Sequence, residues 1–206
     1  MSAIEAYIGI GANLGDPVAQ VRQACRDLAE RLPESRLMAC SRLYRNPPLG
    51  PQEQPDYVNA VACLHTRLSA RGLLSALQAI ERHHGRDRSH NPQRWGPRTL
   101  DLDLLLFGDQ VIHEPHLTVP HPGIAQRNFV LYPLLEIAPD LCIPQLGAVS
   151  ALCAQQAADT LVAIASAEPG NRSYPFRPPG ISSKTPPDVD RTYAALHNKQ
   201  LNKLPR

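Results

Sequence analysis

The sequence predicts an α/β (α+β) domain of the ferredoxin-like, split β-α-β type. We expect a mainly antiparallel sheet with helices on one face and an open ligand-binding face on the other. Three observations predict it: apolar residues alternate in several short stretches, they recur at helical spacing in two others, and the stretches follow in the order β-α-β-β-α-β. A chain of 206 residues is long enough for one such domain and a tail.

The first strand is expected over residues 5–11, where apolar positions alternate. The segment from Gly9 to Gly15 resembles a dinucleotide fingerprint but fails it, because its third glycine comes one residue late. We expect it to form a tight strand-to-helix turn. Asp16 is then the expected N-cap of a helix over residues 17–32.

The second strand is expected over residues 36–45, and the prolines that follow Asn46 cannot continue it because proline lacks an N–H donor. A third strand is expected from Tyr57 to Thr66, with Tyr57 and Asn59 on one face. An aromatic ring and an amide on one face suit a flat, hydrogen-bonding heterocycle. The alternative is that both are ordinary surface residues.

A second helix is expected from its cap at Ser69 to about His84, and Gly85 is placed to end it. The polar segment over residues 86–97 has the length of a functional lid or a disordered loop. After the next strand, Val111 and Ile112 are expected to pair back as a short hairpin.

A helix is expected over residues 124–138, interrupted at Pro133, and a short helix near 150–164 closes the domain. We therefore assign residues 1–164 to the folded domain. Residues 165–206 are polar and rich in proline, which predicts an extended, largely disordered tail.

The strand expected over residues 99–107 carries the candidate chemistry. Four alternate leucines from Leu100 to Leu106 form a core face, whereas Asp101 and Asp103 share the other face, roughly 7 Å apart along the backbone. Mg²⁺ is typically bound by one or two carboxylates together with substrate phosphates. The alternative is an exposed face whose acids pair with nearby arginines.

Arginine is concentrated just before this strand. Guanidinium groups bind phosphate in a bidentate manner. A pair of carboxylates beside a set of such bases is the combination that phosphoryl transfer needs, and this favours the metal interpretation. The arginines are Arg82, Arg86, Arg88, Arg94 and Arg98.

Lysine is absent before Lys184, which excludes a P-loop lysine or a Schiff-base lysine from the main domain. A net charge of +2 gives no indication of nucleic-acid or membrane binding, and no apolar run is long enough for a membrane span. The N-terminus lacks the basic region of a signal peptide, and five scattered cysteines without a C-x-x-C motif indicate reduced thiols. We therefore expect a cytoplasmic protein.

Three histidines, His113, His116 and His121, could in principle bind zinc. Their spacing fits no standard zinc site and no cysteine accompanies them, so the pattern does not favour zinc.

Four strings occur in order: Gly-Ala-Asn-Leu-Gly-Asp from Gly11, Tyr-Arg-Asn-Pro-Pro-Leu-Gly-Pro from Tyr44, Gln-Pro-Asp-Tyr-Val-Asn-Ala from Gln54, and Arg-Trp-Gly-Pro-Arg-Thr-Leu-Asp-Leu-Asp from Arg94. Together they strongly resemble the 6-hydroxymethyl-7,8-dihydropterin pyrophosphokinases of folate biosynthesis, over about residues 4–145. The resemblance implies Mg²⁺-dependent transfer of pyrophosphate from ATP to the hydroxymethyl group of the pterin, which releases AMP.

The resemblance also implies roles for individual residues. Asp101 and Asp103 would hold two Mg²⁺ ions, and Arg86, Arg88 and Arg98 would serve catalysis with them. The implied pterin contacts are Asn46, Pro47, Leu49, Tyr57, Asn59, Trp95, Asp101 and Phe129. The implied ATP contacts are Leu74, Gln78, Arg86, Arg88, Arg98, Leu104, His116, Thr118 and His121.

Some positions depart from the family pattern. His116 stands where relatives often carry an arginine, Pro122 replaces an aromatic residue, and Asn46 replaces a common threonine. Two rival functions remain. One is single-stranded RNA binding, which the exposed acids disfavour. The other is a pterin-binding relative without catalysis, which the intact acids and arginines disfavour. Association with other folate-pathway enzymes is left open.

Overall fold

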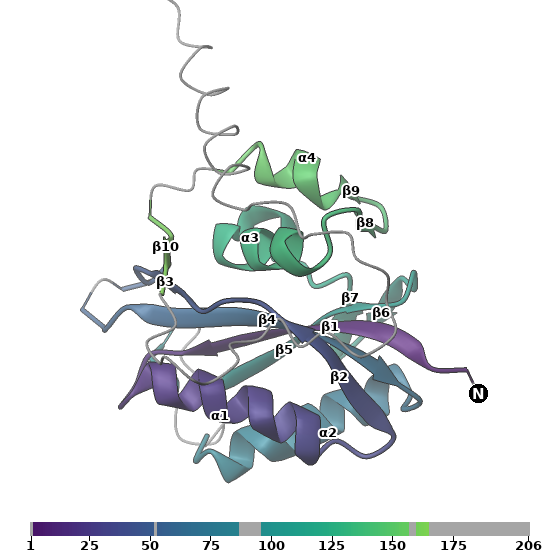
Figure 1. Ribbon diagram of the computed structural model, residues 1–206, viewed down its shortest axis with the longest axis horizontal. Helices are drawn as coiled ribbons and strands as arrows, with labels where there is room; N and C mark the ends of the chain where they lie inside the picture. The colour runs from purple at the N-terminus through teal and green to yellow at the C-terminus, as the bar shows by residue number, and fades with distance from the viewer. Residues whose placement is uncertain (1, 52, 87–95, 157–159, 165–206) are drawn as a thin grey trace, which may run out of the picture.

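The computed structural model describes residues 2–51, 53–86, 96–156 and 160–164 (Figure 1). Its main sheet has the strand order β10-β3-β4-β1-β5, with β2 also paired to β4, and these described pairs are antiparallel. This confirms the ferredoxin-like arrangement. The strands are β1 (Ile4–Ala12), β2 (Ser35–Cys40), β3 (Tyr44–Asn46), β4 (Tyr57–Thr66), β5 (Asp101–Phe107) and β10 (Val162–Ala163).

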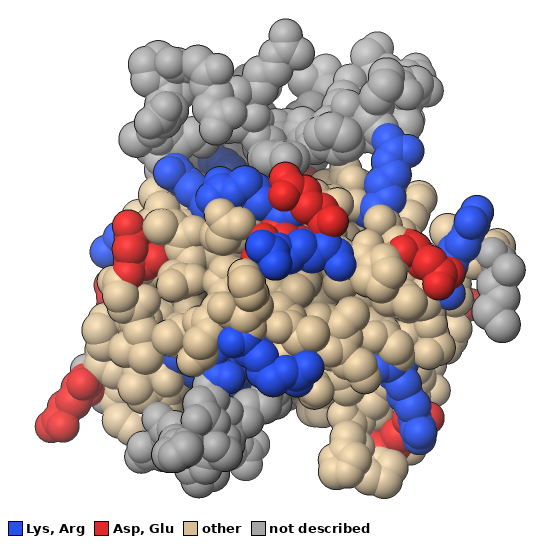
Figure 2. All heavy atoms as spheres, turned by 90° about the horizontal axis from the view of Figure 1, so that it is seen from below, with Lys and Arg blue, Asp and Glu red and all other residues tan. Residues whose placement is uncertain are grey.

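Two helices, α1 (Pro17–Glu30) and α2 (Ala70–His83), cover one face of the sheet (Figure 1). Their predicted caps are confirmed: the side chains of Asp16 and Ser69 each accept a hydrogen bond from the backbone N–H three residues later. Gly85 follows α2 with φ +75°, the left-handed conformation that glycine adopts readily. The outer surface of this helical layer carries interspersed basic and acidic side chains (Figure 2).

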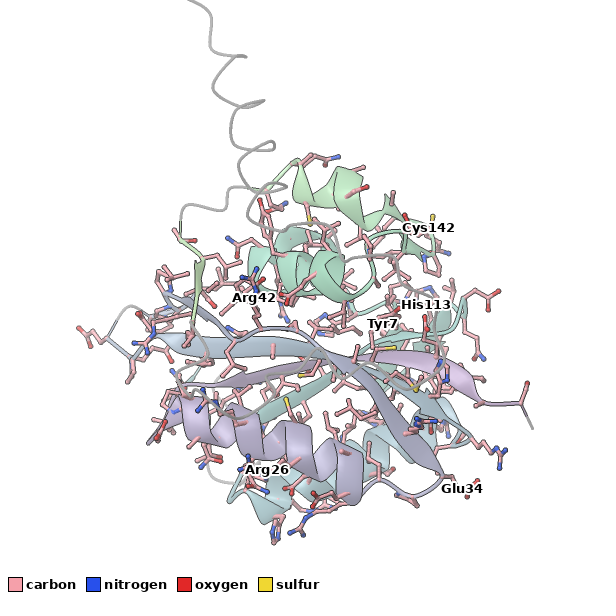
Figure 3. All side chains as sticks on the ribbon, in the orientation of Figure 1. Tyr7, Arg26, Glu34, Arg42, His113 and Cys142 are labelled. Atoms are coloured by element: carbon pink, nitrogen blue, oxygen red, sulfur yellow. The ribbon has the colours of Figure 1, made fainter. Side chains whose placement is uncertain are left out.

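The opposite face is open only in part. There α3 (Asn128–Ile137), a short 3-10 turn (Ile124–Gln126) and α4 (Val149–Cys153) pack with an apolar cluster that includes Tyr7 and Val61. Figure 3 shows Tyr7 and Arg42 between the sheet and this upper layer. The expected open face is therefore smaller than the sheet, because apolar side chains at one end of it require cover.

A bulge in β5 changes which residues share a face. Tyr7 pairs with Leu106 and Ile8 with Leu104, so Leu105 is left without a direct partner in the register. Leu104 belongs to the core beneath α1 and α2, but Leu106 belongs to the opposite cluster. The prediction that all four alternate leucines share one face is wrong for Leu106.

The expected second strand is divided into β2 and β3. The break lies at Ser41, whose Oγ accepts the hydrogen bond of Val61 N at 3.0 Å, while Ser41 N donates to Val61 O at 2.9 Å. A side chain therefore replaces one backbone partner at this point. The expected turn from Gly9 also differs, because β1 continues through Ala12.

Three further predictions differ at the C-terminal side. The residues after β5 do not pair back on it; β6 (Ile112–Glu114) pairs with β7 (Leu117–Val119) instead. Pro133 lies within α3, where it removes only one early hydrogen bond. The helix expected near 150–164 is limited to α4, and β8 (Cys142–Ile143) and β9 (Gly147–Ala148) form a hairpin before it.

No helix in the described part of the chain is long and apolar enough to cross a membrane. The predicted tail over residues 165–206 lies outside the described residues, so its disorder and the domain boundary at residue 164 stay predictions.

Candidate functional site

A cavity of about 570 Å³ opens on the sheet face that α3 covers only in part. Four strands and the segment from His121 to Val130 line it. The structure brings together nine of the predicted site residues in this lining: Asn46, Leu49, Tyr57, Asn59, Arg98, Asp101, Asp103, His121 and Phe129.

Two glycines of β1 form the middle of the cavity floor. Gly11 pairs with Asn59 on one side and with Asp101 on the other, and Gly9 pairs with Asp103. Paired residues in adjacent strands share a face, so Asn59 and the two carboxylates flank a strip of β1 that has no side chains. Asn59 and Asp101 are two strand spacings apart, roughly 10 Å.

Aromatic and amide side chains line one end of the cavity. Tyr57 donates a hydrogen bond from its hydroxyl to Gly96 O at 2.9 Å, which ties the end of β4 to the segment before β5. Burial is the main cause of a raised pKa at Tyr57, so its phenol is neutral near pH 7. Phe129 also lines the cavity, and the Arg127 guanidinium carbon lies 5.9 Å from its ring centroid.

At the other end, Asp101 is paired with two arginines. Its two oxygens accept hydrogen bonds from Arg86 and Arg98, and Arg86 also contacts the carboxylate of Glu81. Burial alone would raise the pKa of Asp101, but the charges and hydrogen bonds of Arg98 and Arg86 hold it below its usual value. Glu81, 1% exposed, also accepts the hydrogen bond of Leu102 N at 2.9 Å.

Asp103 has weaker compensation. Its Oδ2 lies 3.6 Å from Arg127 Nη1 and 3.8 Å from His121 Nε2. Burial and the neighbouring charge of Asp101 raise the pKa of Asp103, against the opposing charges of Arg127 and Arg98. The surroundings of Asp103 therefore stabilise its charged form less well than those of Asp101 do.

His121 is a neutral donor in this setting. Burial and the charge of Arg127 lower its pKa to about 4, although Asp101 opposes the shift. Gly123 N donates to His121 Nδ1 at 3.1 Å, so the proton of the neutral ring lies on Nε2. Nε2–H therefore faces the side of the cavity that carries Asp103.

The donor set around β5 fits Mg²⁺. Among the described residues no three His, Cys, Asp or Glu side chains converge on one point, as a protein-only metal site would require. Two carboxylates on one strand, with arginines beside them, instead match a hard cation that takes its remaining ligands from water and phosphate.

Several predicted residues lie elsewhere. Arg86 is only 12% exposed and anchored between Glu81 and Asp101, rather than on the cavity wall. Arg88 and Trp95 lie outside the described residues. Pro47 is absent from the cavity lining, and the remaining implied ATP contacts are on α2, β5 and the β6–β7 hairpin: Leu74, Gln78, Leu104, His116 and Thr118.

Sequence reasoning missed three features. Gly9 and Gly11 were assigned to a turn, although glycines at alternate positions of a strand indicate close approach of a ligand. Asn13, 1% exposed, was not singled out, although both polar ends of its side chain hold loops beside the cavity. Gln126 also lines the cavity, and no sequence signal identified it.

Comparison with known proteins identifies the family to which the chain is similar. Residues 7–139 match the model of 7,8-dihydro-6-hydroxymethylpterin-pyrophosphokinase (HPPK). A protein of Pseudomonas aeruginosa named 2-amino-4-hydroxy-6-hydroxymethyldihydropteridine pyrophosphokinase is 55% identical over 138 residues, which are 67% of this chain and 83% of that protein. A protein of the same name from Haemophilus influenzae is 47% identical over 152 residues, 74% of this chain and 92% of that protein.

A solved structure shares the fold. The crystal structure titled Plasmodium falciparum HPPK-DHPS wild type with STZ-DHP superimposes with a TM-score of 0.59 at 12% sequence identity. The match covers 74% of this chain and 43% of that one. At this identity the likeness supports the fold alone.

Proposed function

This chain belongs to the 7,8-dihydro-6-hydroxymethylpterin-pyrophosphokinase family, and from that premise we propose how its cavity supports the reaction. The chain is a diphosphotransferase of folate biosynthesis with ATP as co-substrate. It transfers pyrophosphate to the hydroxymethyl group of 6-hydroxymethyl-7,8-dihydropterin, which gives the pterin diphosphate and AMP.

The alignment of Asn59, Gly11 and Asp101 across three strands is the observation that carries the proposal. The strip over Gly11 lets a flat ring lie against the sheet. A ring whose edge meets Asn59 then extends its substituent toward Asp101, across roughly 10 Å. This is the right order of length for a bicyclic ring with a hydroxymethyl arm.

We assign the ring to the space between Tyr57 and Phe129, where two aromatic faces can stack on it. Asn59 reads the ring edge, and Leu49 adds apolar contact at the mouth. Asn46, Pro47 and Trp95 are assigned to the same end by family resemblance.

We assign the phosphates of ATP to the end that carries Arg98 and His121. Arg98 offers a fixed positive charge and His121 a neutral N–H donor, so both stabilise phosphate oxygens without depending on His121 protonation. The adenine would then lie along the outer edge of β5, where α2 and the β6–β7 hairpin meet, and where the salt bridge between Arg71 and Glu114 joins them at 2.6 Å. The residues assigned to ATP are Leu74, Gln78, Arg86, Arg88, Arg98, Leu104, His116, Thr118 and His121.

Asp101 and Asp103 would hold Mg²⁺, which we propose as two ions. The chemistry that the bound ions supply is neutralisation of phosphate charge. In the reaction the hydroxyl oxygen of the pterin forms a bond to the β-phosphorus of ATP, the bond from that phosphorus to the AMP oxygen breaks, and the hydroxyl proton is released. The protein's own part is to align the two substrates and to stabilise the developing charge.

The proposed location is the cytoplasm, because the five cysteines of the sequence are scattered, odd in number and without a C-x-x-C motif.

The test is a coupled assay for AMP released from ATP by the purified chain, with and without the pterin alcohol. We expect AMP only when the pterin alcohol and Mg²⁺ are both present, and loss of AMP formation in Asp101→Asn. AMP formation that is independent of the pterin alcohol would contradict the proposal. An Asp109→Asn variant, on the exposed turn after β5, serves as the matched control.

A further inference from the structure

Two buried amide side chains lie at the end of the cavity to which we assign the pterin ring, and they are hydrogen-bonded to each other. Asn59 Nδ2 donates to Asn46 Oδ1 at 2.6 Å, and Asn46 Nδ2 donates to Pro47 O at 2.8 Å. Asn46 is 4% exposed and Asn59 is 6% exposed, so water does not replace these bonds freely.

The carbonyl of Pro47 sets the direction of this chain of hydrogen bonds. A carbonyl can only accept, so Asn46 must turn its amide nitrogen toward Pro47 and its amide oxygen toward Asn59. Asn59 must then turn its own nitrogen toward Asn46. Rotating either amide by 180° would place two acceptors or two donors against each other.

The remaining polar atom, Asn59 Oδ1, is left for the cavity. It lies over Gly11, where a Cβ would come within 2.8 Å of it, and both residues line the cavity. Within the described segments no donor hydrogen-bonds to this oxygen. The wall of the cavity therefore presents a fixed acceptor at this point.

We propose that Asn46 is a positioning residue, which holds the Asn59 amide with its oxygen toward the cavity, so that the site selects a ring edge carrying an N–H donor. The proposal rests on the function given above and deepens it. It also reassigns Asn46, which the sequence placed in contact with the pterin: both polar ends of its side chain are used within the protein. A threonine hydroxyl at this position could donate or accept, and would fix no direction.

The acceptor atom Asn59 Oδ1 determines which chemical class of ring the site prefers. The 2-amino-4-oxo edge of a pterin offers N–H groups, and its 2,4-diamino counterpart has nearly the same shape but replaces the ring N–H with an acceptor nitrogen. A buried acceptor facing an acceptor loses its hydrogen bond and stays desolvated, which disfavours the diamino ring. We expect the wild-type protein to prefer the 4-oxo ring by about tenfold or more, which corresponds to one such mismatch.

The experiment measures dissociation constants of the two 6-hydroxymethyl rings by calorimetry for the wild-type protein and variants at Asn46. In Asn46→Ala the Asn59 amide is free to turn, so the preference for the 4-oxo ring should fall at least about threefold, toward equal binding. In Asn46→Asp an acceptor still faces Asn59, so the preference should be retained. In Asn46→Thr the hydroxyl fixes no direction, so the preference should fall as it does in Asn46→Ala.

Leu49→Ala is the matched control, because Leu49 lines the same cavity and its apolar side chain cannot hydrogen-bond to either amide. Leu49→Ala should weaken the binding of both rings equally and leave the ratio of their dissociation constants unchanged. A merely structural role for Asn46 would lower the affinity for both rings together and would raise the KM for ATP as well. An unchanged ratio in Asn46→Ala, or equal losses in Asn46→Ala and Asn46→Asp, overturns the proposal.

Measurements of ring binding and of AMP release distinguish a failure of this inference from a failure of the proposed function. If the preference for the 4-oxo ring depends on Asn46 but the wild-type protein releases no AMP, the function fails and the inference stands. If AMP is released normally but the preference does not depend on Asn46, only the inference fails. A wild-type protein that binds neither ring overturns both.

Discussion

Asn13 Oδ1 accepts a hydrogen bond from the backbone N–H of Arg98 at 2.7 Å, while Asn13 N donates to Arg98 O at 3.0 Å. The amide nitrogen of the same side chain donates to Gln54 Oε1 and Pro55 O, each at 3.1 Å. One buried side chain therefore joins the segment that leads to Tyr57 with the segment that carries Arg98.

Asn13→Ala should weaken substrate binding at both ends of the cavity. Removing a buried amide with three partners costs about 1–3 kcal/mol of unfolding free energy, and the freed segments should raise the KM for both substrates. Urea unfolding and steady-state kinetics check this. Gln54→Ala, which removes one of the three bonds, should have a smaller effect; an equal effect would contradict the role of Asn13.

Asp103→Ala should abolish Mg²⁺-dependent turnover without unfolding the protein. A loss of about a thousandfold in kcat, or about 4 kcal/mol, is the scale expected when a carboxylate that holds a catalytic metal is removed. The free energy of unfolding should stay the same or rise, because burial and Asp101 make the charged carboxyl unfavourable there. Mg²⁺ titration of AMP release checks the first point, and normal activity would remove the metal role.

Gly11→Ala should impair the pterin end, whereas Gly9→Ala should not. A Cβ at Gly11 would come within 2.8 Å of Asn59 Oδ1, a rigidly bonded group, but a Cβ at Gly9 would meet only the movable end of Leu105 at 3.3 Å. We expect the KM for the pterin alcohol to rise about tenfold in Gly11→Ala, with little change in the KM for ATP. Equal behaviour of the two variants would show that the floor of the cavity tolerates side chains.

Arg86 and Arg98 should differ in their effect on stability. Arg86→Ala removes a buried partner from Glu81 and Asp101, which should cost about 3 kcal/mol of unfolding free energy together with activity. The Arg98 side chain is 30% exposed, so Arg98→Ala should lower activity with a stability loss below about 1 kcal/mol. Chemical unfolding of both variants decides this; a larger stability loss in Arg98→Ala would reverse the assignment.

Asp27 links α1 to the end of α2, and it should make the free energy of unfolding depend on pH in the acidic range. Burial would raise its pKa, but hydrogen bonds from His84 and Gln23 and the charge of Arg31 outweigh this and lower it. A carboxyl whose pKa is lower in the folded than in the unfolded state stabilises the fold above its unfolded pKa of about 3.9, and this contribution disappears as pH falls through the folded pKa. The stability difference between wild type and Asp27→Asn should therefore be full above about pH 4 and shrink below it.

Unfolding of both proteins between pH 7 and pH 2 measures that difference. Asp109→Asn, on an exposed turn, should follow the wild-type curve. A difference that grows toward low pH would contradict the assignment.

Much of the fold was predictable because local signals agreed with the global arrangement. The third strand begins at Tyr57 and ends at Thr66 as expected, and the caps at Asp16 and Ser69 place both helices. The errors arise where a distant contact decides the local structure. The break at Ser41 depends on its bonds to Val61, and the bulge in β5 depends on the register against β1.

Several residues that line the candidate site were predictable from the sequence, but the layout of the site was not. Asp101, Asp103 and Asn59 were singled out from residue type and strand alternation, and all three line the cavity. The anchored position of Arg86 was not predicted, because charge density in the sequence does not show which carboxylate a guanidinium will meet.

The order of residues alone is enough to predict the periodicity, the helix caps and the residue types that can bind a cation, a phosphate and a flat ring, because these depend on neighbours a few positions apart. The folded chain was needed to show that Asn59, Gly11 and Asp101 form one row, and that Asn46 hydrogen-bonds to the amide of Asn59. Pairing between strands that are distant in the chain brings these groups together, and their hydrogen-bond directions are set by partners that the order of residues does not reveal.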